Sequence, residues 1–280
     1  MTTSEKLPFK AAAHDLDYTL LHGSDISQEN VLAVQRLADR GLTNLIATGR
    51  NFHHALKYHR ALGLTGPMVS SDGACVSIPG GAIIQERTLP LEISTALLQL
   101  SQDSEISCLC FFRHGIYVTS KFDWNAGMDR HREIGSHYRE VKPAAMSKRK
   151  IYKTLHFSET PARLDDLQAK VSESYGASVD VIRNGPNTLE VVPKGVSKVS
   201  GLKAVAEYLG LDSSEFVVFG DGNNDLGMFA WAGFSVCMHH GSPLALKSAR
   251  IVAPETEIGV NFASAVDAMI EVNGEKERVA

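Results

Sequence analysis

Two aspartates stand one residue apart near the N-terminus, in the stretch AAAHDLDYTLL. Residues two apart on an extended strand point to the same side, so the carboxylates of Asp15 and Asp17 can face one ligand. Two close carboxylates repel, and both stay ionised only beside a cation, for which oxygen ligands favour Mg²⁺. One carboxylate can then attack as a nucleophile while the other transfers protons. Alone, the pair is equally consistent with a surface turn or a structural cation site.

Two further segments offer groups that bind phosphate oxygens. IATGR ends in Thr48 and Gly49, which supply a hydroxyl and a backbone amide, although this is a common strand-to-helix turn. PKGVSKVSG opens an expected helix, with Lys198 in its first turn, where the helix dipole disfavours a cation. A lysine there is better explained if it meets an anion, and a solvated lysine is the alternative.

A fourth segment, VVFGDGNND, presents Asp221, Asn224 and Asp225 after a buried strand. Acidic groups after a glycine-containing turn suit metal coordination, and the alternative is a helix N-cap by Asn223 or Asn224. The four segments together supply a nucleophile, a proton carrier, a metal site, a hydroxyl and a fixed cation. Phosphoryl transfer needs this inventory, because its catalysis is mostly positioning and charge neutralisation.

The elements that must position these groups alternate between strand and helix. Strands are expected at 9–17 and 42–49, and helices at 27–41, with Ser27 as its cap, and at 51–63. The same alternation returns from residue 195 to the C-terminus, which predicts a parallel sheet with crossover helices.

The middle of the chain reads differently, as closely spaced strands, a helix at 160–176 and a hairpin turning at Asn184-Gly185. We therefore expect an α/β fold, a Rossmann-like parallel-sheet core of residues 1–83 and 188–280. Residues 84–187 would form an inserted α+β cap domain. The stretch 121–140 in this insert carries aromatic, basic and histidine residues suited to a polar phosphorylated metabolite, with exposed helical residues as the alternative.

Composition places the chain among ordinary globular proteins. It has 280 residues, of which 44% are hydrophobic and 21% charged, and its net charge is -4. No basic stripe indicates nucleic-acid binding, the short basic run 147–150 reads as a solvated loop, and no apolar run is long enough for a membrane span. We expect a cytoplasmic protein by default, with unusual export left open. Its four cysteines form no C-x-x-C pair, and Cys108 and Cys110 would share one face of a strand as buried thiols in a reducing compartment.

In this order and spacing, the segments resemble the haloacid dehalogenase (HAD) superfamily of phosphatases, in particular its Cof-type branch (subfamily IIB, C2-capped). DLDYTLL is similar to the first motif of the family, D-x-D-G-T-L-L. ATGR resembles the second motif, Lys198 the third and GDGNND the fourth, and ETEIGV resembles the loop before the final helix. The resemblance covers nearly the whole chain.

The resemblance implies a role for each matching residue. Asp15 would attack phosphorus, and Asp17 would protonate the leaving oxygen and then activate water. The phosphoryl group would be bound by Thr48, Lys198, Asn224 and the backbone amides of Leu16 and Gly49. Mg²⁺ would be bound by Asp15, Asp221 and the backbone carbonyl of Asp17, with Asp225 in the outer shell.

Three positions depart from the family pattern. Tyr18 stands where the family has glycine, and it either adopts ordinary dihedral angles or stores strain. Its ring either narrows the mouth of the site or packs against cap or core, so we expect a slower or more selective enzyme. Asp72 replaces asparagine and would repel phosphate unless it is paired or turned away. His240 also replaces asparagine, and with His239 it is either a polar anchor or a satisfied loop residue.

The expected function is a Mg²⁺-dependent phosphatase that hydrolyses small phosphate monoesters, such as sugar phosphates or phosphorylated cofactors, through an aspartyl phosphate. Two alternatives stay open. The first is a phosphomutase-type phosphotransferase, which would protect the intermediate from water. The second is a catalytically weak protein that binds a phosphate ligand, which only Tyr18 and Asp72 favour. The sequence does not indicate the oligomeric state.

Overall fold

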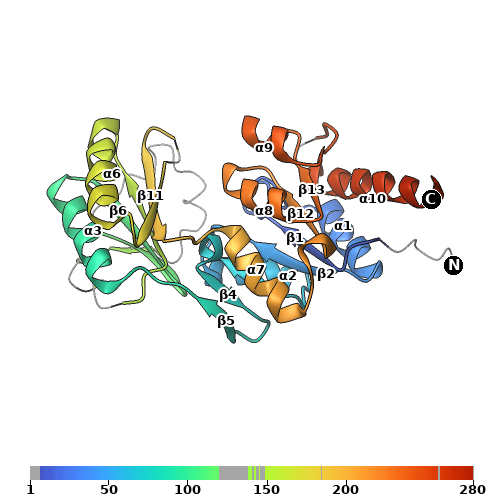
Figure 1. Ribbon diagram of the computed structural model, residues 1–280, viewed down its shortest axis with the longest axis horizontal. Coiled ribbons are helices and arrows are strands. Elements are labelled where there is room, and N and C mark those ends of the chain that lie inside the picture. The colour runs from blue at the N-terminus through green and yellow to red at the C-terminus, as the bar shows by residue number, and fades with distance from the viewer. Residues whose placement is uncertain are drawn as a thin grey trace. The chain divides into compact units, whose positions relative to one another are not determined.

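The computed structural model describes residues 7–119, 138–140, 142, 145, 149–183, 185–257 and 259–279. The chain divides into two compact units (Figure 1). Unit 1 comprises the described parts of Met1–Gly49, Ala55–Gln85 and Ser197–Ala280, and unit 2 those of Arg50–His54 and Glu86–Val196. Unit 2 is thus inserted within the chain of unit 1. That residues 84–187 act as a cap stays a prediction, and the polar stretch at 121–137 and Asn184 lie outside the described residues.

Unit 1 is built on an eight-stranded sheet in the order β14-β13-β12-β1-β2-β3-β4-β5. Neighbouring strands from β14 to β3 are parallel, and β4 runs antiparallel to β3. The strands are β1 (Ala11–His14), β2 (Thr43–Ala47), β3 (Met68–Ser70), β4 (Cys75–Ser77), β5 (Ile83–Glu86), β12 (Phe216–Gly220), β13 (Phe234–Cys237) and β14 (Ile251–Val252). The predicted parallel-sheet α/β fold is confirmed.

Helices cover both faces of this sheet (Figure 1). One face packs against α7 (Lys198–Leu209) and α8 (Leu226–Trp231), with α9 (Pro243–Ser248) beside α8. The other face carries α1 (Gln28–Asp39) and α10 (Asn261–Val279), which pack against each other. Helix α2 (Phe52–Ala61) connects β2 to β3.

Strand β1 forms although alanine is a poor strand former, because it lies between β12 and β2 and is buried on both faces. Ala11 and Ala13 face the core below α7 and α8. The next residue, His14, faces the opposite side, where its Nε2 lies 2.9 Å from Asn44 Oδ1 and its ring packs edge-on against Phe262 of α10. The small side chains of β1 let helices pack closely on both faces of this central strand. Because β1 lies in the middle of the sheet, the residues that follow it also lie there.

Unit 2 contains a six-stranded sheet in the order β10-β11-β9-β6-β7-β8, in which only the β7–β8 pair is parallel. The strands are β6 (Ser107–Phe112), β7 (Gly115–Val118), β8 (Tyr138–Glu140), β9 (Lys153–Phe157), β10 (Val179–Arg183) and β11 (Thr188–Pro193). Helices α3 (Leu91–Asp103) and α6 (Pro161–Tyr175) pack together against it. Helix α3 is absent from our sequence prediction, although Ile93, Leu97 and Leu98 carry a helical period along its buried face.

The described cysteines are all buried free thiols. Cys108 and Cys110 share the face of β6 that packs below α3 and α6, with their sulfur atoms 4.0 Å apart, as the alternation of that strand predicts. In the basic run, Arg149 and Lys150 are exposed as expected. Within the described part of the chain, none of the helices combines the length and apolar character needed to cross a bilayer.

The start of helix α1 depends on one serine. Ser27 Oγ accepts a hydrogen bond from the Asn30 amide at 3.1 Å and donates one to the Gly259 carbonyl at 2.5 Å. Replacing Ser27 with alanine removes the helix cap and the tie to the loop before α10. We expect S27A to lower the free energy of unfolding by about 1–2 kcal/mol in urea denaturation. Q28A, at an exposed position of the same helix, should change it by less than about 0.5 kcal/mol, and an equal effect of both would contradict the capping role.

Candidate active site

The chemically important segments meet at one edge of the unit 1 sheet, where adjacent parallel strands end. Asp15 follows β1, Thr48 follows β2 and Asp221 follows β12, and these strands are neighbours in the order β12-β1-β2. The Asp15 amide donates to the Phe219 carbonyl at 3.0 Å, which fixes Asp15 against the end of β12. Open α/β sheets bind ligands at this edge, because the loops that leave the strands diverge there.

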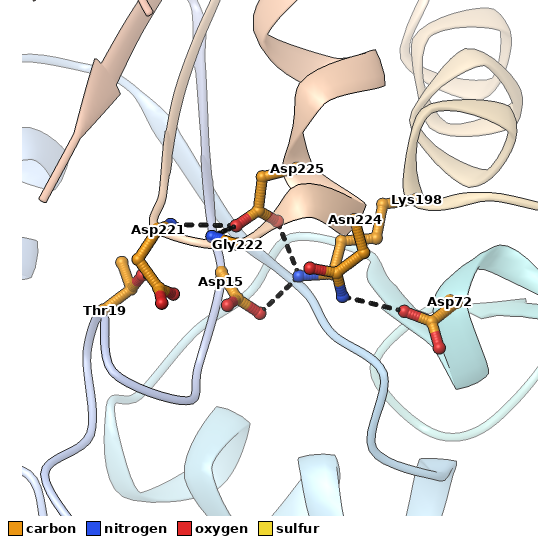
Figure 2. Close-up of polar contacts among 8 residues, drawn as sticks. All are labelled: Asp15, Thr19, Asp72, Lys198, Asp221, Gly222, Asn224 and Asp225. Carbon is orange, nitrogen blue, oxygen red and sulfur yellow. Dashed lines mark hydrogen bonds and ion pairs between the residues drawn. The ribbon is translucent and has the colours of Figure 1, made fainter. Parts of the chain in front are cut away.

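Lys198 is the centre of the site (Figure 2). It is the first residue of α7, just after the capping residue Ser197, and only 1% of it is exposed. Its Nζ lies 2.6 Å from Asp15 Oδ1 and 2.7 Å from Asp225 Oδ1. Lys198 is therefore not a solvated lysine, and the unfavourable helix dipole at its position is offset by two carboxylates.

Charge and burial shift the pKa values of these groups in opposite ways. Burial alone would lower the pKa of the Lys198 ammonium, but the carboxylates of Asp15 and Asp225 outweigh it and hold the pKa above its usual value. Burial raises the pKa of the Asp15 carboxyl well above its usual range, Lys198 opposes this, and Asp225, Asp221 and Asp17 add to it. The single ammonium of Lys198 does not balance the charge of these carboxylates. The remaining negative charge favours the binding of a cation beside Asp15.

Asp225 is fully engaged by hydrogen bonds. While its Oδ1 binds Lys198, its Oδ2 accepts the amides of Asp221 and Gly222 at 2.9 and 2.8 Å. A β-carbon on Gly220 would collide with this carboxylate, so the glycine makes room for it. The side chain that accepts hydrogen bonds from the amides of this turn is therefore that of Asp225. The alternative of a helix N-cap by Asn223 or Asn224 does not hold. This arrangement suits a residue in the outer shell of a metal site, where it would orient Asp221.

Asp15, Asp221 and Asp225 form a carboxylate cluster in which one oxygen of each lies within 4.8 Å of the others. Burial, followed by repulsion from Asp225, raises the pKa of Asp221 to about 7, against Lys198 and a 3.2 Å hydrogen bond from Thr19 Oγ1. Asp17 adds to the repulsion on both Asp15 and Asp221, so it lies nearby. Hard oxygen donors under mutual repulsion fit a divalent cation such as Mg²⁺. Thr19 is absent from the residues predicted from the sequence, although it stands only two residues after Asp17 in the same motif.

The remaining predicted phosphate-binding residues lie in the segments that follow β1, β2 and β12. Thr48 is buried, and its amide donates to the Val69 carbonyl of β3 at 3.0 Å. Leu16 is buried at the turn after β1, where its carbonyl accepts the amides of Leu20 and Leu21 at 3.0 and 2.8 Å. Asn224 is exposed, and its Nδ2 donates to Asp72 Oδ1 at 3.2 Å. The roles of these residues toward phosphate stay predictions.

The three departures from the family pattern have definite surroundings in the structure. Tyr18 has a φ of 60°, so it adopts the left-handed region instead of ordinary dihedral angles, and 44% of it is exposed. Its carbonyl lies 2.8 Å from His240 Nε2, and His240 Nδ1 lies 3.4 Å from Asn261 Nδ2, which makes His240 a hydrogen-bonded loop residue. Asp72 is buried and paired with Asn224, the arrangement in which an added carboxylate is tolerated.

Comparison with known proteins agrees with this geometry. A family model described as haloacid dehalogenase-like hydrolase matches residues 12–261. The chain belongs to this family. The match spans both units and includes all the expected site residues, and it confirms the resemblance and the expected class of enzyme, a phosphoric monoester hydrolase of the HAD superfamily.

Individual relatives are similar over most of their length. A putative phosphatase of Haemophilus influenzae is 29% identical, over 90% of this chain and 92% of its own. An HMP-PP phosphatase of Cronobacter sakazakii is 26% identical, over 85% of this chain and 86% of its own. A solved sugar phosphatase of HAD subclass IIB has the same fold, with a TM-score of 0.79 and 21% identity over 94% of this chain and 98% of its own.

The raised pKa of Asp221 predicts pH-dependent metal binding. Below pH about 7 its carboxyl is protonated and must release a proton before it can bind a cation. The apparent affinity for Mg²⁺ should therefore fall by at least about tenfold for each unit of pH lost, since Asp15 also has a raised pKa. Titration calorimetry at pH 6 and pH 8 in buffers of different ionisation enthalpy would measure both the affinity and the released proton. D221N should bind Mg²⁺ weakly and D39N, at an exposed position of α1, normally. An affinity that is equal at both pH values would contradict the prediction.

Proposed function

We propose that the protein is a Mg²⁺-dependent phosphatase that hydrolyses small phosphate monoesters through an aspartyl phosphate on Asp15. The observation that carries this proposal is the ammonium of Lys198, held within 2.7 Å of both Asp15 and Asp225 at the carboxyl edge of a HAD-type sheet. It offsets the charge of a carboxylate that must attack a group which is itself negative. Such a reaction depends on positioning and charge neutralisation more than on covalent assistance.

In the first step an oxygen of Asp15 attacks phosphorus, and the bond from phosphorus to the leaving oxygen breaks. Asp17 gives its proton to that oxygen, so the product leaves as an alcohol. In the second step Asp17 takes a proton from water, the water oxygen attacks phosphorus, and the bond to Asp15 breaks. Inorganic phosphate is released, and both aspartates return to their starting states.

Other residues of unit 1 would bind the substrate and the cation. Thr48, Asn224 and the amides of Leu16 and Gly49 would hold the phosphoryl oxygens, together with Lys198. Asp15, Asp221 and the carbonyl of Asp17 would hold Mg²⁺, with Asp225 and Thr19 orienting Asp221 through the hydrogen bonds described above. When bound, the cation supplies positive charge that neutralises the phosphoryl group and favours ionised Asp15.

The proposed substrates are small phosphorylated metabolites, such as sugar phosphates or phosphorylated cofactors. Support comes from relatives whose names specify such compounds and from a sugar phosphatase with the same fold. A small substrate also suits a site built from side chains at the end of one sheet. Unit 2 is the proposed cap, which would select among these substrates and exclude water.

The decisive experiment measures phosphate release over a panel of phosphorylated metabolites with Mg²⁺ and with a chelator. We expect D15N to lose at least about a thousandfold in turnover, because it removes the nucleophile. D39N, which removes a carboxylate at an exposed position of α1, should keep full turnover. Equal release by D15N and wild type would refute the mechanism. Turnover only in the presence of an activating bisphosphate would indicate a phosphomutase, and tight binding without turnover a binding protein.

Tyr18 should limit the rate or the range of substrates. Its ring is exposed at the turn that carries the catalytic aspartates, and its left-handed backbone is one that glycine adopts without strain. We expect Y18G to raise kcat severalfold or to extend turnover to bulkier esters in the same panel. Y18F retains the ring and separates the effect of the hydroxyl. An unchanged rate and substrate range in Y18G would show that the tyrosine does not restrict the site.

A further inference from the structure

The segment from Ser71 to Gly73 holds a strained conformation beside the proposed phosphate site. All three residues have positive φ, at 49°, 53° and 99°, and two of them are not glycine. Gly73 packs so closely against the Ser197 carbonyl that a β-carbon would collide with it, and the Asp72 amide donates to the Thr48 carbonyl at 3.0 Å. The fold thus fixes Asp72 between the end of β2 and the start of α7.

The carboxylate of Asp72 lies beside three groups that would bind the phosphoryl oxygens, those of Asn224, Gly49 and Lys198. Figure 2 shows its hydrogen bond with Asn224. Its Oδ1 accepts the 3.2 Å hydrogen bond from Asn224. Its oxygens lie 3.0–3.1 Å from the point where a β-carbon on Gly49 would stand, so it packs directly against that glycine. It also lies close enough to Lys198 to stabilise the charged ammonium. Only 8% of Asp72 is exposed, which keeps solvent from screening its charge.

This carboxylate is an acceptor among donors. A hydroxyl, an amide, an asparagine and an ammonium all offer protons to a phosphoryl oxygen, whereas ionised Asp72 can only accept one. A fully ionised oxygen placed beside it is repelled, whereas an oxygen that carries a proton can donate a charge-assisted hydrogen bond. The effect on binding therefore depends on whether the tetrahedral anion still has a proton.

We propose that Asp72 is a specificity-determining residue of the phosphoryl site, which accepts a hydrogen bond from a protonated phosphoryl oxygen and so selects tetrahedral anions that carry a proton. This inference rests on the proposed function, because it uses the same phosphate-binding groups. No covalent bond changes: the proton stays on the ligand oxygen and is shared with Asp72. Near neutral pH inorganic phosphate meets the requirement both as its monoanion and as its dianion, each of which carries a proton, and sulfate, of similar size and shape, has no proton to donate.

The test measures binding of inorganic phosphate and of sulfate to the Mg²⁺-loaded protein by titration calorimetry. Wild type should bind phosphate about ten- to a hundredfold more tightly than sulfate, the range expected for one charge-assisted hydrogen bond. In D72N this preference should shrink to about threefold or less, chiefly because sulfate binds better. D39N should keep the wild-type preference, since it removes a carboxylate at an exposed position.

The ratio of the two affinities separates the possible outcomes. If Asp72 only repels anions, D72N will gain affinity for both equally, and if it only supports the turn, both will weaken equally; an unchanged ratio overturns the inference. D72G provides a second variant, because glycine and asparagine both tolerate the left-handed backbone at this position. If neither anion binds to wild type or to either variant, the proposed function fails, and this inference fails with it. Binding with an unchanged ratio leaves the proposed function intact.

Discussion

The rest of the site depends on one buried positive charge. The Lys198 ammonium pairs with Asp15 and Asp225, which come from segments 183 and 27 residues away along the chain. Removing one partner of such a buried pair typically costs about 3–5 kcal/mol, because the remaining charge stays buried without compensation. The start of α7, the end of β1 and the turn after β12 are therefore held together by the same ammonium that offsets the charge of Asp15, the proposed nucleophile.

The excess of negative charge explains the other features of the site. Asp15 and Asp221 both have raised pKa values, and neither Lys198 nor the Thr19 hydroxyl overcomes the burial and repulsion that raise them. A cation binding here would therefore favour the ionised state that nucleophilic attack requires. Asp225 spends its oxygens on Lys198 and on two backbone amides, so it orients the cluster instead of adding a flexible ligand.

Backbone strain is concentrated near these charges. Tyr18, Ser71 and Asp72 account for three of the four described non-glycine residues with positive φ, and all three lie in loops at the carboxyl edge of the unit 1 sheet. Each left-handed residue of this kind costs about 1–2 kcal/mol, which the surrounding hydrogen bonds and packing must offset. Two of these residues, Tyr18 and Asp72, are among the three positions where the sequence departs from the family pattern. The proposed differences in rate and anion selectivity thus come from the side chains of Tyr18 and Asp72 on this strained backbone, while the proposed catalytic residues match the family motifs.

The sequence by itself determined the features that depend on local pattern. The α/β class, the Ser27 cap and the shared face of Cys108 and Cys110 follow from periodicity and side-chain chemistry over a few residues. Helix α3 also has a local signal, the helical period of Ile93, Leu97 and Leu98, although the sequence prediction lacks this helix. Only the tertiary structure decided which groups meet: that Lys198 binds two carboxylates, that Thr19 reaches Asp221, and that Asp72 pairs with Asn224, 152 residues away. The physical reason is that such contacts, and the left-handed turns at Tyr18 and Asp72, arise when distant strand ends are brought to one edge of a sheet, and no short stretch of sequence contains that information.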